Sequence, residues 1–332
     1  MVDEEYLASL RSGDEWTAIG RARELRRRGA AADDLLDHLV AAGERRAGEL
    51  WLSGTWSLAE EHVATSVSEQ VQAALVADLM RSSAGEQRVR PQVVVACAEG
   101  ELHTLPARMV ADRLRLAGCR TVFLGSVSSG QLRSVVHEWC PDAIVLSCTM
   151  AFNFAGLVRS LSAVSDADAP ALIGGAAVSD AALAERLGAD GWAEDATDLV
   201  RAVMGARTLA PRSGRRLWPE EPFLLQERLP ALTGIALTAI LERSQRLEPY
   251  DGWSLALTGE LLEHLLTTAG AAVLVDDPSV LVAFAQWSAT YLRHRGEHPL
   301  VLAASMVEVA ARCDAELAGI GRFLRLAAEQ VE

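Results

Sequence analysis

Residues 93–106 read Val93-Val94-Val95-Ala96-Cys97-Ala98-Glu99-Gly100-Glu101-Leu102-His103-Thr104-Leu105-Pro106. They pass from an apolar run into a polar loop, and a helical pattern follows over residues 106–117. Open α/β sheets bind their ligands in the turns that follow the carboxyl ends of parallel strands. We therefore expect His103 at the mouth of a sheet, where its imidazole could bind a metal centre. Glu101 could hold the other ring nitrogen, as carboxylates do for metal-ligating histidines.

A single loop histidine is more often an ordinary surface residue, so the neighbouring loops decide its interpretation. Strand-like and helix-like segments alternate between residues 92 and 205, which predicts a flavodoxin-like, Rossmann-like doubly wound parallel sheet of about five strands. Ser147-Cys148-Thr149 follows the third apolar run and Gly174-Gly175 follows the fourth. Hydroxyls offer hydrogen bonds, and paired glycines let a ligand approach the backbone. Together with His103, these loops would line one edge of the sheet.

The segments on both sides of this domain have helical patterns. Residues 1–85 have breaks near Gly13, Gly29 and Gly54, which predicts a bundle of about four helices. The sheet domain spans 90–206, a linker rich in Pro, Gly and charge spans 207–222, and an all-α domain spans 223–332. Helices of the last domain are expected near 224–229, 231–247, 255–269, 278–295 and 299–328.

Composition excludes several classes of function. A net charge of −14 argues against a nucleic-acid surface, which needs a basic stripe. No apolar run is long enough to span a membrane, and the acidic start does not resemble a signal peptide. The five cysteines form no CxxC pair, which suits the cytoplasm. The chain contains no lysine, so Schiff-base chemistry and a P-loop are excluded.

The order Glu-x-His, Ser-x-Thr and Gly-Gly at successive strand ends resembles the cobalamin-binding domain family. The resemblance implies that His103 is the lower cobalt ligand and that Glu101 is its hydrogen-bond partner. Pro106 stands where the family usually has glycine, so we expect a shifted helix start rather than a lost site. The cofactor-binding residues implied here are Glu101, Leu102, His103, Thr104, Leu105, Ser147, Thr149, Gly174 and Gly175, the last four beside the nucleotide tail.

The predicted bundle carries Trp51 and, after nine residues, Glu61-His62. This Trp-x9-Glu-His pattern is similar to that of the adenosylcobalamin-dependent photoreceptors related to CarH. The resemblance implies a cap over the upper face of the corrin. Trp51 would pack on the 5′-deoxyadenosyl group, Glu61 would hydrogen-bond the adenosine, and His62 would be an upper cobalt ligand after light. The alternative is that Trp51 is a core residue and Glu61-His62 lies on a polar helix face.

The domain layout resembles the photocobilins, which bind cobalamin and the bilin biliverdin. A bilin needs a flat apolar slot, cations for its propionates, and polar partners for its ring nitrogens. The candidates are Arg293, His294, Arg295, His298 and His264, with Tyr250 and Trp253 as walls and Cys313 as a tether. The alternative for the C-terminal domain is a dimerisation or signalling bundle.

These resemblances imply a cytoplasmic photoreceptor that is not an enzyme, does not bind nucleic acid or membrane, and forms a homo-oligomer. Photolysis of adenosylcobalamin would change its conformation or assembly, with biliverdin as a possible second chromophore and a downstream protein as effector. Two alternatives stay open: a corrinoid methyl carrier for a partner methyltransferase, and a cobalamin sensor without photochemistry. Methyl carriers usually read Asp-x-His-Asp-Ile-Gly-Lys, whereas this chain reads Glu-Leu-His-Thr-Leu-Pro.

Overall fold

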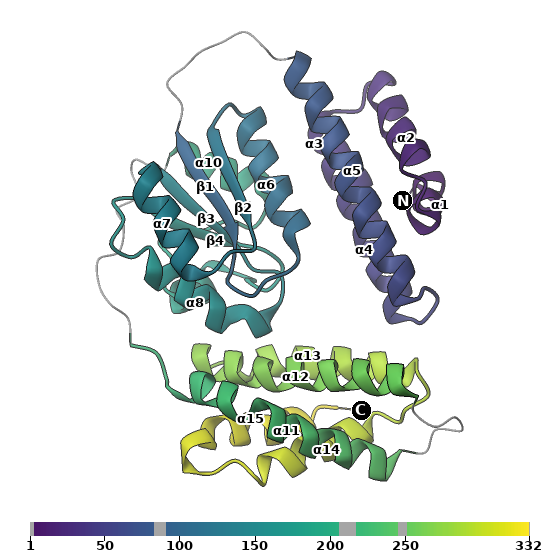
Figure 1. Cartoon of the computed structure of the whole chain (residues 1–332), viewed down its shortest axis with the longest axis vertical. Helices are drawn as coiled ribbons and strands as arrows, with labels where there is room; N and C mark the ends of the chain where they lie inside the picture. Colours follow the sequence, from purple (N-terminus) through teal and green to yellow (C-terminus); the bar gives the residue numbers. More distant parts are fainter. Residues whose placement is uncertain (1–2, 83–90, 206–216, 245–250, 332) are drawn as a thin grey trace.

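The computed structural model describes residues 3–82, 91–205, 217–244 and 251–331. The junction at 83–90, most of the predicted linker and Tyr250 lie outside the described residues. Figure 1 shows a helical bundle beside a sheet domain, with a block of C-terminal helices below both.

The N-terminal bundle breaks where its glycines predict. Gly13, Gly29 and Gly54 all have positive φ, a conformation that other residues rarely adopt. Ser57 and Glu60 form a capping box, with Ser57 N donating to Glu60 at 2.7 Å and Glu60 N to Ser57 Oγ at 3.2 Å. The elements are α1 (Glu4–Ser12), α2 (Glu15–Arg27), α3 (Ala32–Leu35), the π-helical turn η1 (Leu36–Val40), α4 (Ala41–Leu52) and α5 (Leu58–Ser82).

The sheet domain confirms the predicted fold class. Its five parallel strands have the order β2-β1-β3-β4-β5. The strand order therefore reverses between β1 and β3, the switch point at which doubly wound sheets bind ligands. The strands are β1 (Gln92–Cys97), β2 (Arg120–Gly125), β3 (Ala143–Ser147), β4 (Ala171–Gly174) and β5 (Gly191–Trp192). The helices are α6 (Thr104–Leu116), α7 (Ser129–Trp139), η2 (Ala151–Asn153), α8 (Phe154–Ala163), α9 (Ala181–Leu187) and α10 (Ala196–Met204).

Helix α6 begins two residues before the predicted start. Pro106 is therefore its third residue, where a missing N–H costs no intrahelical bond. The apolar face of α6 joins the bundle, because Leu105 and Met109 are buried in the same core as Tyr6 and Leu10. The cap and the sheet domain thus share a packed interface along α6.

The predicted division of the C-terminal domain into helices is wrong at two places. Pro230 was expected to end a helix but lies inside α11, whose Leu225, Leu232 and Ala236 are buried in the C-terminal core. That burial outweighs the lost backbone hydrogen bond. The segment 299–328 is two helices, since Asp314 caps a new turn by accepting from Glu316 N. The elements are α11 (Glu221–Arg243), α12 (Gly252–Val275), α13 (Pro278–Arg293), α14 (Leu300–Ala310), η4 (Ala315–Leu317) and α15 (Ala318–Ala328).

Helix α11 has the length and hydropathy of a membrane span, and it is the single such helix in the described ranges. One face of it is buried against α12 and α14 in the C-terminal core. Core helices of ordinary domains can have the same length and hydropathy as a membrane span. The C-terminal helices also contact both other domains: α12 packs on η2 and α8, and Trp51 packs against the C-terminal core.

Candidate functional site

The loop after β1 folds around a buried carboxylate. Ala98 N donates to Ser147 O at 2.8 Å and Glu101 N to Ala98 O at 2.9 Å, which closes a turn that requires positive φ at Gly100. Glu101 is fully buried and accepts from His103 N at 2.9 Å and from His103 Nδ1 at 2.6 Å. Its second oxygen accepts from Thr149 N, Met150 N and Asn153 Nδ2 at 2.9–3.0 Å.

These hydrogen bonds set the charge of the pair. Burial would raise the pKa of Glu101, but the donors from His103 and Met150 outweigh it and hold the pKa at about 2. The resulting carboxylate raises the pKa of His103 through their hydrogen bond, and Glu61 adds to that rise. The His103 side chain is 53% exposed, and its Nε2 has no hydrogen-bond partner in the described part of the chain. Glu101 therefore orients His103 with one nitrogen free to bind a metal.

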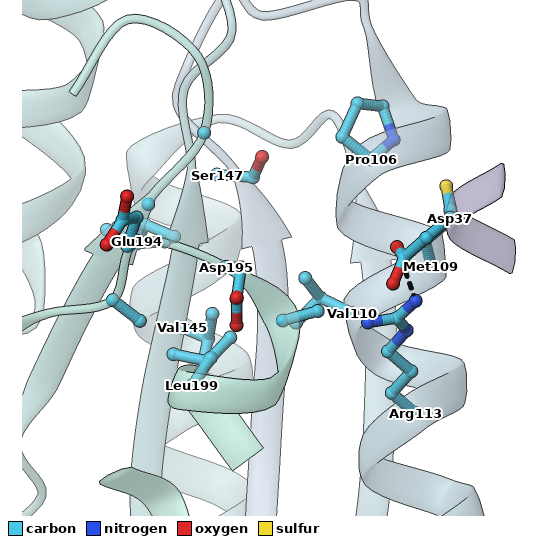
Figure 2. A pocket seen from close by; sticks show the side chains of 15 residues that line it. Asp37, Pro106, Met109, Val110, Arg113, Val145, Ser147, Glu194, Asp195 and Leu199 are labelled. Atoms are coloured by element: carbon cyan, nitrogen blue, oxygen red, sulfur yellow. Dashed lines mark ion pairs between the residues drawn. The ribbon is translucent and has the colours of Figure 1, made fainter. Parts of the chain in front are cut away.

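A cavity of about 180 Å³ opens beside this loop (Figure 2). Ser147, Gly174 and Gly175 line it, because the register places Cys97 beside Ser147 and Ser147 beside Gly174. A Cβ at Gly175 would lie 2.3 Å from Cys148 O, so the cavity wall needs glycine. Thr149 lies next to Glu101 instead, and its buried Oγ1 has no partner among the residues described.

We expect Gly175→Ala to destabilise the protein by about 1–3 kcal/mol, because the residue has φ +104° as well as the close carbonyl. The matched control is Gly234→Ala in α11, where the added Cβ meets nothing within 4 Å and helix propensity improves. Urea unfolding of both variants measures the difference. Equal stability of the two variants would contradict the assigned backbone strain.

The cap supplies a second histidine held by a carboxylate. Glu61 lies 2.5 Å from His62 Nδ1, and the His62 side chain is 69% exposed. The charge of Glu61 reaches His103, since it contributes to the raised pKa of that residue.

The remaining residues of the predicted motif after β1 lie beside His103 in the chain. Leu102 is 80% exposed, Leu105 is buried, and Thr104 Oγ1 donates to Glu69 at 3.3 Å.

A buried carboxylate of the cap gives a pH-dependent prediction. Burial raises the pKa of Glu44 from 4.5, with the charges of Glu61 and Glu69 adding to the rise, although Ser68 and Thr65 both donate to it. A raised folded-state pKa lowers stability as pH rises through it. Glu44→Gln should therefore raise Tm by a few degrees at neutral pH, and the gain should disappear below pH 4.5. Thermal melts between pH 4 and 8 test this, and a pH-independent difference would contradict it.

Trp51 lies in α4 of the cap, and its side chain packs against α13. Its ring centroid lies 5.8 Å from that of Trp287 and 5.5 Å from that of Tyr291. Arg295 lies 5.7 Å from the centroid of the Trp51 ring and donates to Trp51 O at 3.3 Å. This contact joins residues more than 200 positions apart, so local sequence patterns do not predict it; only the i, i+4 spacing of Trp287 and Tyr291 indicates a shared helix face.

The aromatic contacts continue toward the sheet. Phe284 stacks on Trp287 at 5.6 Å, and Phe152, in the loop after β3, lies 6.2 Å from Phe284. His264 of α12 stacks on Phe152 at 4.0 Å. We name the group formed by Trp51, Tyr291, Trp287, Phe284 and Phe152 the aromatic row.

The predicted bilin residues are not gathered at one site. Arg295 and His264 border the aromatic row, whereas Arg293 lines a separate hollow with Gln286 and Thr290. Cys313 packs against Gly321, and burial raises the pKa of its thiol. Of the other candidates that the structure describes, Trp253 is 64% exposed, and His294 and His298 are also exposed.

Two sequence models of the B12-binding domain match the chain, over residues 2–75 and 91–201. The chain is a cobalamin-binding protein. The matched ranges cover the cap and the sheet domain, and the C-terminal helices lie beyond them. The cavity glycines, the unpartnered Thr149 hydroxyl and the oriented His103 all fit this cofactor.

The chain is similar in sequence to a corrinoid protein and to a transcriptional repressor, and similar in fold to a second corrinoid protein. Trimethylamine corrinoid protein 2 of Methanosarcina acetivorans is 25% identical over 60% of this chain and 93% of its own length. The HTH-type transcriptional repressor CarH of Myxococcus xanthus is 35% identical over 42% of this chain and 46% of its own. The Methanosarcina barkeri monomethylamine corrinoid protein has the same fold, with a TM-score of 0.52 at 20% identity over 60% of this chain and 95% of that one.

Proposed function

We propose that this chain is a cytoplasmic light sensor that carries adenosylcobalamin. A conformational change triggered by light would pass through Trp51 to the C-terminal helices. The position of Trp51 is the observation that carries the proposal. Trp51 belongs to the cap, where it begins the Trp-x9-Glu-His pattern, yet its ring packs on Trp287 and Tyr291 of α13. The cofactor would supply a cobalt–carbon bond that light breaks.

The chain's own residues would hold the cofactor from both sides. His103 would offer Nε2 to cobalt from the sheet domain, with Glu101 fixing its ring. Ser147, Gly174 and Gly175 would receive the nucleotide tail. Glu61 and Trp51 would contact the adenosyl group, and His62 would be the imidazole available once that group has left.

Signal transmission follows from the packing of Trp51. Arg295 holds both the Trp51 ring and its carbonyl, and it also lies 3.5 Å from the Tyr291 ring centroid. A displacement of Trp51 must therefore break or rebuild contacts with α13. Packed interfaces rearrange between discrete states, so a local change there can alter domain packing or self-association. A downstream effector would read that change, and the chain would not itself be an enzyme.

The rival function is a corrinoid methyl carrier. It is favoured by the match along 93% of trimethylamine corrinoid protein 2. A methyl carrier must present the upper face of its cofactor to another enzyme, however, and here the cap residue Trp51 is tied to α13. A cobalamin sensor without photochemistry would use the same contacts with no need for light.

A bound biliverdin would pack against Trp287 of the aromatic row, with Arg295 as the neighbouring cation.

The deciding experiment is the absorption spectrum of the purified protein with adenosylcobalamin, in the dark and after green light. We expect a dark histidine-ligated spectrum that converts irreversibly to a form with two imidazole ligands. No change under light, together with methyl transfer to a partner enzyme, would establish the methyl carrier. A cofactor-dependent change in assembly in the dark would establish the sensor. Added biliverdin should produce a new red band only if the second chromophore binds.

A further inference from the structure

The nucleotide-tail cavity has a buried cation in its wall. Arg113 of α6 is 5% exposed and lines the cavity together with Pro106, Met109 and Val110 on the same helix face. The opposite wall includes the apolar, buried Val145 and Leu199 and the carboxylates Glu194 and Asp195 (Figure 2). An arginine in such a position must find partners, because burying an unpaired charge is costly.

The partners of Arg113 come from the cap. Arg113 Nη2 lies 2.5 Å from Asp37 Oδ1 (Figure 2) and donates to Asp33 O at 3.4 Å. Asp37 belongs to the π-helical turn η1, a rare conformation that often marks functional positions. Both carboxylates are accessible to water, with side-chain exposures of 49% for Asp37 and 70% for Asp33. The cap therefore covers one edge of the guanidinium.

The guanidinium of Arg113 is incompletely satisfied. Its Nε is buried and makes no hydrogen bond within the described residues, since Asp33 Oδ1 lies 3.7 Å away. Arg113 therefore has donor capacity beyond its contacts with the cap, and because its side chain lines the cavity, a ligand acceptor there would use that capacity. Arginine suits a phosphodiester oxygen or a ring nitrogen, because its donors form a fixed planar fork.

We propose that Arg113 recognises the nucleotide tail of the corrinoid, and that Asp37 couples occupancy of the tail cavity to the position of the cap. Arg113 would donate to an acceptor of the tail on the cavity side and hold Asp37 on the cap side. A corrinoid with its tail would then be selected over one without it. This inference rests on cobalamin binding and is independent of light sensing.

The test compares adenosylcobalamin with adenosylcobinamide, which lacks the nucleotide tail, by equilibrium binding in the dark. Arg113→Met should weaken adenosylcobalamin binding by about 10–100-fold, the value of a charge-assisted hydrogen bond, and leave adenosylcobinamide within about twofold. Arg115→Met is the matched control, because Arg115 lies on the same helix but pairs with Asp112 away from the cavity. It should change neither affinity.

Two further variants complete the test. Arg113→Lys keeps the charge without the fork, so it should lower the preference for the tailed corrinoid even if Arg113→Met folds poorly. Asp37→Asn should increase hydrogen exchange over residues 33–40 in the protein without corrinoid. An equal loss of affinity for both corrinoids, or an unchanged preference in the Met and Lys variants, would overturn the proposal. Because every measurement is made in the dark, failure of the photoreceptor function would not affect the result.

Discussion

Replacing His103 by alanine should abolish the histidine-ligated spectrum of bound cobalamin and weaken binding by more than about 100-fold. The expectation follows from the geometry: Glu101 holds Nδ1 at 2.6 Å and leaves Nε2 as the free nitrogen. Loss of a supporting partner alone typically costs metal sites about 10–100-fold. Titration of the dark protein with adenosylcobalamin, followed by absorption, measures both effects.

The chain contains its own matched control for His103. His62 is also an exposed imidazole whose Nδ1 is held by a glutamate, at 2.5 Å, but it lies in the cap. His62→Ala should leave the dark spectrum and affinity unchanged and should alter only the product formed after light. If His62→Ala removes the dark histidine-ligated spectrum and His103→Ala does not, the assigned ligand faces are reversed.

The lower half of the site could be predicted from the sequence because its chemistry lies at strand ends. Apolar runs locate the strands, and parallel strands bring the loops at Glu101, Ser147 and Gly174 to one edge. Asn153, which donates to Glu101, was missed because it follows Ser147 by six residues inside an apolar segment and carries no spacing signal.

The contacts between domains could not be predicted in this way. In the sequence, Arg113 is one of several charged residues on an amphipathic helix. Its burial depends on the packing of the cap on α6. Pro230 was predicted to end a helix by local rules, but burial of α11 between two neighbours overrides them. Trp51 could be assigned to the cap pattern, while its partners on α13 depend on tertiary structure.

Trp287→Ala should uncouple the structural response to light from photolysis of the bound cofactor. Trp51 makes two aromatic contacts with α13 and one cation–π contact with Arg295, together worth about 2–4 kcal/mol. That energy can shift a two-state equilibrium by roughly 30- to 1,000-fold, which is enough to change the dominant state. Removing the Trp287 ring should reduce the shift by about tenfold, because one aromatic contact and the packing of Tyr291 are lost together.

Hydrogen exchange of α13 and the oligomeric state, each measured in the dark and after green light, give the readout. In the natural protein we expect both to change on illumination; in Trp287→Ala, photolysis should proceed with little change in either. Trp253→Ala is the control, since Trp253 is 64% exposed at the start of α12 and has no part in the aromatic row. A full structural response in Trp287→Ala would show that the signal leaves the cap by another path, such as the α5–α6 interface or the Asp37–Arg113 pair.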